Sequence, residues 1–440
     1  MSELRDFARQ VLEMARREGV RDGSVLAWEE REDNVRFANN GLSLALGSAK
    51  RGVTLCFNEG RKRVVGSSTA LESGYLRDHI AKLLRSLRTL EEGDAETHLE
   101  PATGSPAGMR YEPAGPEQLA QAAQEAIHAA LGEGAARVTG IIAQLHRRVA
   151  LCTSSGFEGE NEYGGITLNV RAFANKEASG HGLSCANALR ALEPRAAGRE
   201  AGEAARRMLS RAAIEEGEYE VLLSPTVAAH LMEHVGSFAS AYAVEIGGSF
   251  LANRLGQQVA SPQISLYDLG QAEGGLLARS FDDEGMATGK TAILQGGVLR
   301  AYLHNLVTAR RFRAQSTGNA GYVVPRTWNL VVEAGDAAWE EMVREVKKGL
   351  LVTNTWYTRF QNYLTGEFST MPRDGLFYIE QGDVKHGVAG IRLSSSLPLF
   401  LSKAKLLGKA RRWVKWWEVE TPTLCPPILA EGFRVTRALF

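Results

Sequence analysis

The segment Ser224-Pro225-Thr-Val-Ala-Ala-His230-Leu-Met-Glu233-His234-Val235 determines how the second half of this chain is interpreted. Ser224 offers a hydroxyl cap and Pro225 fits a first turn, so the segment predicts a helix. On that helix His230 and His234 are four residues apart, and Glu233 lies on the same side. Two imidazoles and a carboxylate are groups that zinc accepts as ligands. The order His-x-x-Glu-His is that of an inverted metalloprotease motif, whereas the usual His-Glu-x-x-His order is absent.

Two interpretations of this helix follow from the residues. In the first, His230 and His234 hold zinc, Cys425 supplies a third ligand from Thr423-Leu-Cys425-Pro-Pro427, and Glu233 acts as general base. In the second, the histidines line a partly exposed helix face and bind no metal. The helix therefore decides whether the chain is an enzyme in its own right.

Composition sets broad limits on the class of protein. The chain has 440 residues, 44% of them apolar and 23% charged, with 51 basic against 51 acidic residues. This length predicts two domains, and the zero net charge implies no general attraction to nucleic acid or to a membrane surface. The first residues read as a charged amphipathic helix, and no apolar run reaches the length of a membrane span. We therefore expect a cytoplasmic protein.

The four cysteines, Cys56, Cys152, Cys185 and Cys425, are scattered and form no Cys-x-x-Cys pair. This spacing argues against a disulfide scaffold and against a self-contained zinc ribbon. We expect all four to be small buried residues.

Hydrophobic periodicity predicts an α+β protein. Helical spacing predicts helices at 3–18, 76–90, 116–131 and about 196–213. Alternation predicts short strands at 24–28, 34–37, 42–46, 52–57, 137–142, 148–153, 165–173, 219–223, 291–294, 298–303 and 375–380. Segment 94–116, rich in Gly, Pro, Ala and Glu, predicts a surface loop. We place an N-terminal helix-and-meander α/β domain at 1–215 and a mostly antiparallel, barrel-like β domain at 216–440.

Two further motifs are weaker. Gly285-Met-Ala-Thr-Gly289-Lys-Thr291 has three residues between its glycines where a phosphate loop needs four, and it leads into a strand, so we reject a phosphate site. The triplet Asp282-Asp283-Glu284 offers carboxylates to a hard cation, but consecutive residues of an extended segment point to alternate sides. We favour a turn there.

Two segments combine aromatic and polar residues. Lys409-Ala-Arg-Arg-Trp-Val-Lys-Trp-Trp417 suits a subunit interface or core better than nucleic acid, given the neutral chain. In Trp356-Tyr-Thr-Arg-Phe-Gln-Asn-Tyr363, Arg359 is a candidate contact to an extended peptide backbone, the alternative being an ordinary packed strand.

The C-terminal half resembles the TldD/PmbA family (peptidase U62-like), and more closely its PmbA (TldE) branch. The blocks that carry the resemblance follow the family order between about 219 and 437. They are Leu223-Ser-Pro225, Gly247-Gly-Ser-Phe-Leu251, Leu255-Gly-Gln-Gln258, Phe281-Asp-Asp-Glu-Gly285, Gly296-Gly-Val-Leu299, Ser316-Thr-Gly-Asn-Ala-Gly321, Gly349-Leu-Leu-Val352, Gly366 and Gly375-Leu-Phe. The N-terminal half fits by length and layout.

The resemblance implies an inactive subunit. TldD-type chains carry a His-Glu-x-x-x-His helix and a later cysteine; PmbA-type chains keep the fold, lose this motif and pair with a TldD subunit. In that pattern His230 takes the first histidine position, while Leu231 and Val235 stand where the glutamate and last histidine belong. Zinc is then expected in a TldD-like partner, in a heterodimer, and not in this chain; a homodimer is the other arrangement.

The resemblance leads us to expect a silent subunit of a peptidase for unfolded or short peptides. An autonomous metallopeptidase using His230, Glu233 and His234 stays open as an alternative. A nucleic-acid or gyrase-associated regulator, suggested by the family's historical name, is a third interpretation, although the zero net charge argues against nucleic acid as a partner.

Overall fold

The computed structural model describes residues 2–105 and 110–438, and its first half is one long curved antiparallel sheet. Strand order is β3-β2-β1-β4-β5-β6. The strands are β1 (Asp22–Ala38), β2 (Gly41–Glu59), β3 (Lys62–Ser68), β4 (Arg137–Thr153), β5 (Glu158–Phe173) and β6 (Ser179–Ala186). The helices of this half are α1 (Glu3–Arg17), α2 (Ser73–Thr89), α3 (Pro116–Gly132) and α4 (Pro194–Arg207), with a 3₁₀ turn η1 (Leu189–Ala191). The four expected helices are confirmed, although α4 ends at Arg207 and not at the expected 213.

The expected antiparallel meander is confirmed, but its strands are longer than predicted: β1, β2, β4 and β5 are each 16 to 19 residues long. The polar middle of β1 continues as strand since Glu30 lies opposite Lys50 on β2 and Arg147 on β4, and opposite charges stabilise cross-strand pairs. The chain reverses at Asn39 and Asn40, whose φ values of 51° and 70° suit a tight hairpin turn. Strand β6 was not predicted.

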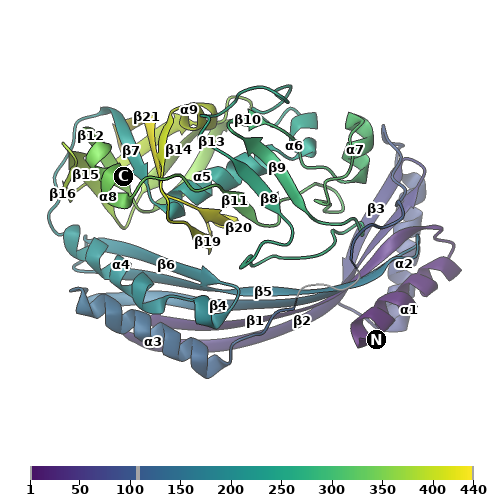
Figure 1. Ribbon diagram of the computed structural model, residues 1–440. Coiled ribbons are helices and arrows are strands. Elements are labelled where there is room, and N and C mark those ends of the chain that lie inside the picture. Colours follow the sequence, from purple (N-terminus) through teal and green to yellow (C-terminus); the bar gives the residue numbers. More distant parts are fainter. Residues whose placement is uncertain (1, 106–109, 439–440) are drawn as a thin grey trace.

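One face of the long sheet is covered by helices. Val25 and Ala27 pack with α1 and α2, and Val35 and Phe37 pack with α3 and α4. Alternate residues of a strand share a face, so the even-numbered residues of β1 point to the other, concave side. That side faces the C-terminal half (Figure 1).

The C-terminal half contains two sheets. One has the order β10-β9-β8-β11-β20-β19, and the other β13-β14-β17-β21-β7-β12-β15-β16, with β18 beside β21. Strands of the first sheet are β8 (Leu266–Leu269), β9 (Lys290–Gln295), β10 (Val298–Leu299), β11 (Leu330–Val332), β19 (Arg412–Trp416) and β20 (Val419–Cys425). Strands of the second are β7 (Gly217–Leu223), β12 (Lys348–Val352), β13 (Thr355–Asn362), β14 (Glu367–Pro372), β15 (Leu376–Glu380), β16 (Asp383–Gly387), β17 (Ile391–Ser396), β18 (Ala404–Leu407) and β21 (Ile428–Arg437). The helices are α5 (Pro225–Phe238), α6 (Ala241–Glu245), α7 (Leu306–Phe312), α8 (Trp339–Glu345) and α9 (Leu397–Ser402).

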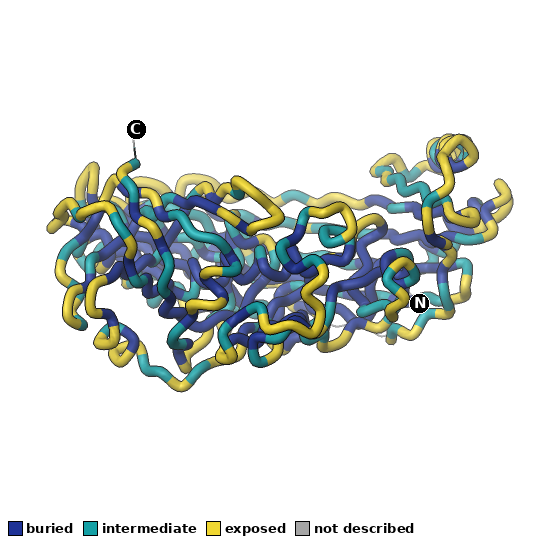
Figure 2. The backbone as a smooth tube through the Cα atoms, turned by 90° about the horizontal axis from the view of Figure 1, so that it is seen from above, coloured by how far each residue is buried: buried dark blue, intermediate teal, exposed yellow. Residues whose placement is uncertain are grey.

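The molecule is therefore α+β with curled sheets, as expected. Figure 2 shows buried backbone following the long strands and the C-terminal core, with exposed backbone at the loops and ends. All four cysteines are free and buried, which confirms their expected role. Irregular backbone occupies 94–105 and 110–115, while 106–109 of the expected loop lie outside the described residues. Among the described helices, none is long and apolar enough to cross a membrane.

The acidic triplet Asp282–Glu284 forms a buried turn where the two halves meet. Oε1 of Glu284 accepts a hydrogen bond of 2.8 Å from Nη1 of Arg63 on β3, and both side chains are almost wholly buried. Asp282 accepts backbone N–H bonds from Glu284, Met286 and Ala320, and Asp283 pairs with arginines. Backbone N–H groups and guanidinium groups thus supply hydrogen bonds to all three carboxylates. Through the Arg63–Glu284 pair the triplet connects the N-terminal half to the C-terminal half.

Candidate functional site

Helix α5 lies between the two C-terminal sheets, directly after β7. Its cap is the predicted one, because Oγ of Ser224 accepts a hydrogen bond from the N–H of Val227 and Pro225 occupies the first turn. Eleven of its fourteen residues are buried. A helix buried this completely is a core helix, so its histidines and glutamate are placed in an apolar surrounding.

The rings of His230 and His234 contact each other at a tilt of 40°, with their centroids 5.0 Å apart. The ring of His234 also makes an edge contact of 4.8 Å with Phe360 on β13. Burial lowers the pKa of His230 to about 3 and that of His234 to about 4. Nδ1 of His230 and Nε2 of His234 are buried without a hydrogen-bond partner among the described residues. Both rings are neutral, and they share one side of the helix as the spacing predicts.

Glu233 is engaged elsewhere. Its Oε1 atom accepts a hydrogen bond of 2.5 Å from the N–H of Thr421 on β20. Burial raises the pKa of Glu233 to about 7. The carboxylate is therefore held by the neighbouring strand, whereas His234 packs against β13 on a different sheet.

Cys425 belongs to the far end of β20. It pairs in register with Arg412, whose guanidinium donates to Thr226 in the first turn of α5. Thr421, which contacts Glu233, lies four residues back along the strand, about 13 Å away at the usual rise. The Cys425 side chain is fully buried in the apolar core, and burial raises the pKa of its thiol.

These residues do not fit a zinc site. Zinc needs three or four converging donors, and no group of three His, Cys, Asp or Glu side chains within residues 2–105 and 110–438 can hold a metal ion. Leu231 and Val235, in the positions where the TldD pattern has its glutamate and last histidine, are buried in the C-terminal core. The helix thus has apolar side chains, Leu231 and Val235, at the positions of the catalytic glutamate and the second histidine ligand in the TldD pattern.

Arg359, the candidate peptide contact, lies on β13 at the edge of the larger C-terminal sheet. It is exposed, its Nη1 donates to the carbonyl of Thr358, and its guanidinium lies 5.5 Å from the ring centre of Tyr357. The side chain is thus available at a sheet edge.

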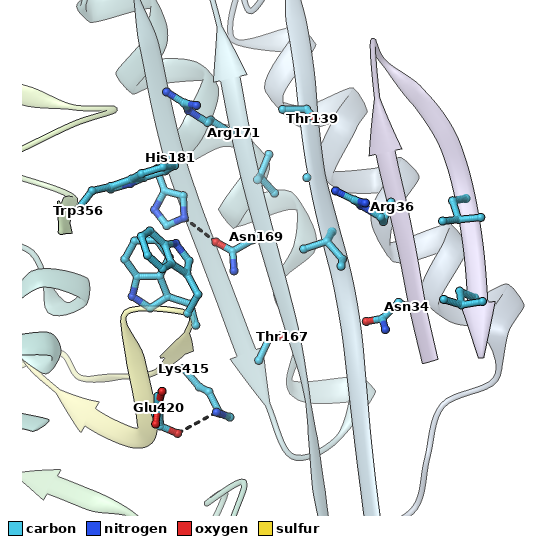
Figure 3. Close-up of a pocket in the computed structure, with 17 residues that line it drawn as sticks. Asn34, Arg36, Thr139, Thr167, Asn169, Arg171, His181, Trp356, Lys415 and Glu420 are labelled. Carbon is cyan, nitrogen blue, oxygen red and sulfur yellow. Dashed lines mark hydrogen bonds between the residues drawn. The ribbon is translucent and has the colours of Figure 1, made fainter. Parts of the chain in front are cut away.

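A cleft of about 960 Å³ separates the concave face of the long sheet from the β19–β20 hairpin, and we call it the interdomain cleft. Figure 3 shows Arg36 and Asn34 on one side and the aromatic side chains with His181 on the other, with Asn169 and Thr167 between them. The lining residues are Asn34, Arg36, Leu44, Leu46, Thr139, Gly140, Ile141, Thr167, Asn169, Val170, Arg171, His181, Trp356, Lys415, Trp416, Trp417 and Glu420. Its size is at the upper end of the roughly 300–1,000 Å³ usual for ligand pockets.

Contacts between β6 and β19 set the aromatic wall of the cleft. The ring of His181 lies 4.9 Å from that of Trp416, and the thiol of Cys185 donates to the carbonyl of Trp413 over 3.0 Å. His181 Nε2 lies 2.7 Å from Oδ1 of Asn169, and burial lowers the pKa of His181 to about 4. The strands that form the floor of the cleft (β1, β4, β5 and β6) and the aromatic wall formed by His181 and Trp416 are therefore packed together.

Sequence reasoning missed the floor of this cleft. It singled out the segment that carries Trp416 and Trp417, and the segment that carries Trp356, but not Arg36, Asn169 or His181. Polar residues on alternate strand positions usually indicate a solvated face, so their pattern is no signal of a site. Only the pairing of β1, β4, β5 and β6 brings them together.

Comparison with known proteins supplies the family. Residues 216–437 match the model of the PmbA/TldA metallopeptidase C-terminal domain, and residues 111–209 match that of the central domain. A metalloprotease of Methanocaldococcus jannaschii is 31% identical over 159 residues, 35% of each chain. Metalloprotease PmbA of Escherichia coli O157:H7 is 26% identical over 198 residues, 44% of this chain and 42% of that protein. The matches thus span less than half the length of these curated relatives.

Solved structures are similar over nearly the whole chain. A Thermotoga maritima protein described as a candidate modulator of a DNA gyrase has a TM-score of 0.83 and 27% identity, covering 98% of this chain and 99% of that one. TldE from Thermococcus kodakarensis has a TM-score of 0.83 with the same coverage and 16% identity, a likeness of fold alone. The family models and these relatives agree with the expected resemblance, and the chain belongs to the PmbA/TldD family.

Proposed function

We propose that this chain is a proteolytically silent, PmbA/TldE-like cytoplasmic subunit of a zinc metallopeptidase that acts on unfolded or short peptides. The observation that carries the proposal is helix α5, where Leu231 and Val235 are buried in the core and Glu233 is bound to β20. The helix lacks both a converging ligand set and a free general base. Relatives named as metalloproteases support the peptidase setting.

In this proposal a TldD-like subunit pairs with this chain and holds the zinc ion, which would polarise a scissile carbonyl there. If no TldD-like subunit is present, two copies of this chain would form a homodimer. This chain contributes peptide-holding surface: the interdomain cleft and the edge strand β13 with Arg359 both accept an extended chain. A regulator acting on DNA fits less well, because the chain has zero formal net charge.

The test compares three preparations on an unfolded protein and on fluorogenic short peptides. They are this chain alone, a TldD-like subunit from the same genome alone, and the two mixed. We expect no cleavage by this chain, chelator-sensitive cleavage by the mixture, and co-elution of the two chains. Chelator-sensitive cleavage by the isolated chain, lost in a His230→Ala/His234→Ala variant, would overturn the proposal and make this chain the enzyme.

A further inference from the structure

The interdomain cleft is lined by an arginine that has no ion-pair partner among the described residues. Arg36 on β1 is exposed and forms no ion pair with any described residue. Its cross-strand neighbour on β2 is Leu44, and Asn34 is likewise opposite Leu46. Directly opposite residues of an antiparallel pair share a face, so Arg36 and these leucines line the same side of the sheet.

The remaining charges leave the cleft positive. Arg171 is neutralised by Asp374, whose Oδ1 lies 2.8 Å from Nη2 of the arginine. Lys415 donates its Nζ proton to the backbone carbonyl of Glu420 over 2.8 Å, and no carboxylate among the described residues lies within ion-pair distance of it. The carboxylates of Glu233 and Glu420 both act on Lys415, so Arg36 is the lining cation that no carboxylate of the described residues pairs with. This balance favours an anionic ligand.

Large apolar side chains are exposed at the same place. Leu44 is 50% exposed, Leu46 58% and Trp417 52%. The two leucines lie on the part of β2 before Val53. No described strand pairs with the outer side of this part, because β3 pairs with β2 only from Val53 onward. Apolar surface of this kind beside a ligand-sized hollow marks a binding surface.

The spacing of the strands gives the length of a ligand. Arg36 lies opposite Ile141 on β4, Ile141 opposite Asn169 on β5, and β6 with His181 follows. Three strand spacings of about 4.8 Å place the arginine about 14 Å from the aromatic wall. An extended peptide of about four residues covers that distance. Amide and hydroxyl groups of Asn34, Asn169 and Thr167 line the path and suit the alternating donors and acceptors of a peptide backbone.

We propose that the interdomain cleft binds short extended peptides through a carboxylate, which pairs with the guanidinium of Arg36, while apolar side chains of the peptide contact Leu44, Leu46 and Trp417. Arginine suits this task because its planar fork donates two parallel hydrogen bonds to a carboxylate. Hydrolysis of a peptide bond creates a new terminal carboxylate, so the cleft would prefer cleaved fragments to the parent chain. This inference rests on the proposed function and names the class of peptide held by this chain.

Nucleic acid also combines anions with flat rings, but it fits the cleft less well. Single-strand binders follow the backbone with a series of cations and stack successive bases on aromatic rings. Here a single unpaired arginine lies among neutral amides and leucines, which does not provide the series of cations that a phosphate backbone needs.

The experiment is calorimetric titration of the full chain with an N-acetylated tetrapeptide of alternating alanine and leucine. Three forms are compared: the free acid, the C-terminal amide, and an amide whose last residue is glutamate. We expect the free acid to bind about tenfold more tightly than the plain amide, the gain usual for a charge-assisted hydrogen bond. If the glutamate amide binds as tightly as the free acid, a side-chain carboxylate serves equally: the pairing of Arg36 with a carboxylate is then supported, and the preference for cleaved fragments is refuted.

Variants locate the effect. Arg36→Gln should reduce the acid-to-amide ratio to about one, and Leu44→Ser/Leu46→Ser should weaken both forms equally. Arg51→Gln, an exposed arginine of β2 that is not a lining residue of the cleft, is the control and should keep the tenfold ratio. Equal binding of acid and amide, a preference that survives Arg36→Gln, or tighter binding of a single-stranded tetranucleotide would overturn the proposal. The measurement needs neither a catalytic partner nor cleavage, so its failure is distinguishable from failure of the proposed function.

Discussion

Nε2 of His230 lies 3.5 Å from Oε2 of Glu418, yet the two groups are not an ion pair at neutral pH. Burial lowers the pKa of His230 to about 3 and raises that of Glu418. The distance also exceeds the usual 2.7–3.2 Å of an N–H···O bond. Glu418 instead accepts a hydrogen bond of 2.8 Å from the N–H of Tyr357. Helix α5 thus carries two neutral histidine rings inside an apolar core.

The first prediction concerns metal. Because the donors on α5 and β20 do not converge, the purified chain should contain far less than one zinc ion per molecule. A His230→Ala/His234→Ala variant should have the same content by atomic spectrometry after dialysis against zinc and then metal-free buffer. Near-stoichiometric zinc that disappears in the variant would contradict this.

The second prediction concerns Glu233. Its pKa is raised to about 7, so the folded state holds a proton that the unfolded state releases near pH 4.5. Stability from this group is present below pH 4.5 and is lost as pH rises through 7. Glu233→Gln keeps an oxygen for the N–H of Thr421 and should be more stable than wild type at pH 8, by about 1 to 3 kcal/mol, with little difference near pH 4.5. Denaturant unfolding at both pH values checks this, with the exposed Glu59→Gln as control; an unchanged difference at the two pH values would refute it.

The third prediction concerns the acid limb of stability. The pKa of His234 is lowered to about 4 in the folded state. The unfolded state therefore binds a proton at this residue near pH 6.5, whereas the folded state binds it only near pH 4. Stability from this group is full above pH 6.5 and is lost as pH falls through 4. His234→Phe keeps a ring beside Phe360 and should make the loss of unfolding free energy shallower, by up to about 1.4 kcal/mol per pH unit. His128→Phe, on the exposed side of α3, should change the slope little; parallel curves for His234→Phe and wild type would count against this explanation.

The fourth prediction concerns the junction of the two halves. Arg63 and Glu284 are buried and joined over 2.8 Å, and Oε2 of Glu284 also accepts the N–H of Leu306. Glu284→Gln leaves the Arg63 charge buried and uncompensated, which should cost about 3 to 5 kcal/mol of unfolding free energy. Asp383→Asn, which removes the exposed pair with Lys385, should cost less than about 1 kcal/mol. Similar losses in the two variants would contradict the role given to the buried pair.

The fifth prediction concerns helix packing under the long sheet. A Cβ atom on Gly198 of α4 would lie 2.2 Å from the carbonyl oxygen of Ala126 on α3, so the helices touch through backbone. Gly198→Ala should force them apart and cost about 1 to 3 kcal/mol. At Gly132, the last residue of α3, an added Cβ meets nothing within 4 Å, and Gly132→Ala should be close to neutral. Thermal unfolding of the two variants checks the contrast, and equal melting temperatures would exclude close packing as the reason for Gly198.

Much of the local structure follows from short-range sequence signals. The first helix was predictable because Leu4, Ala8, Val11, Leu12 and Ala15 recur at helical spacing, and these are its buried residues. Long strands were less predictable. The charged run at 29–33 looks like a break between strands, and only pairing with Lys50 and Arg147 on both neighbours explains why β1 continues through it.

By itself the sequence determined that α5 forms, where its cap lies and which residues share its side, because caps and the 3.6-residue period act within a few residues. It also carried the family resemblance through the order of its glycine-rich blocks. Only the tertiary structure decided that Glu233 binds β20, that Cys425 lies away from the histidines, and that Arg36 and Trp417 line the same cleft. These relations join residues up to several hundred positions apart, and they depend on how packed sheets place side chains in space, which no local periodicity specifies.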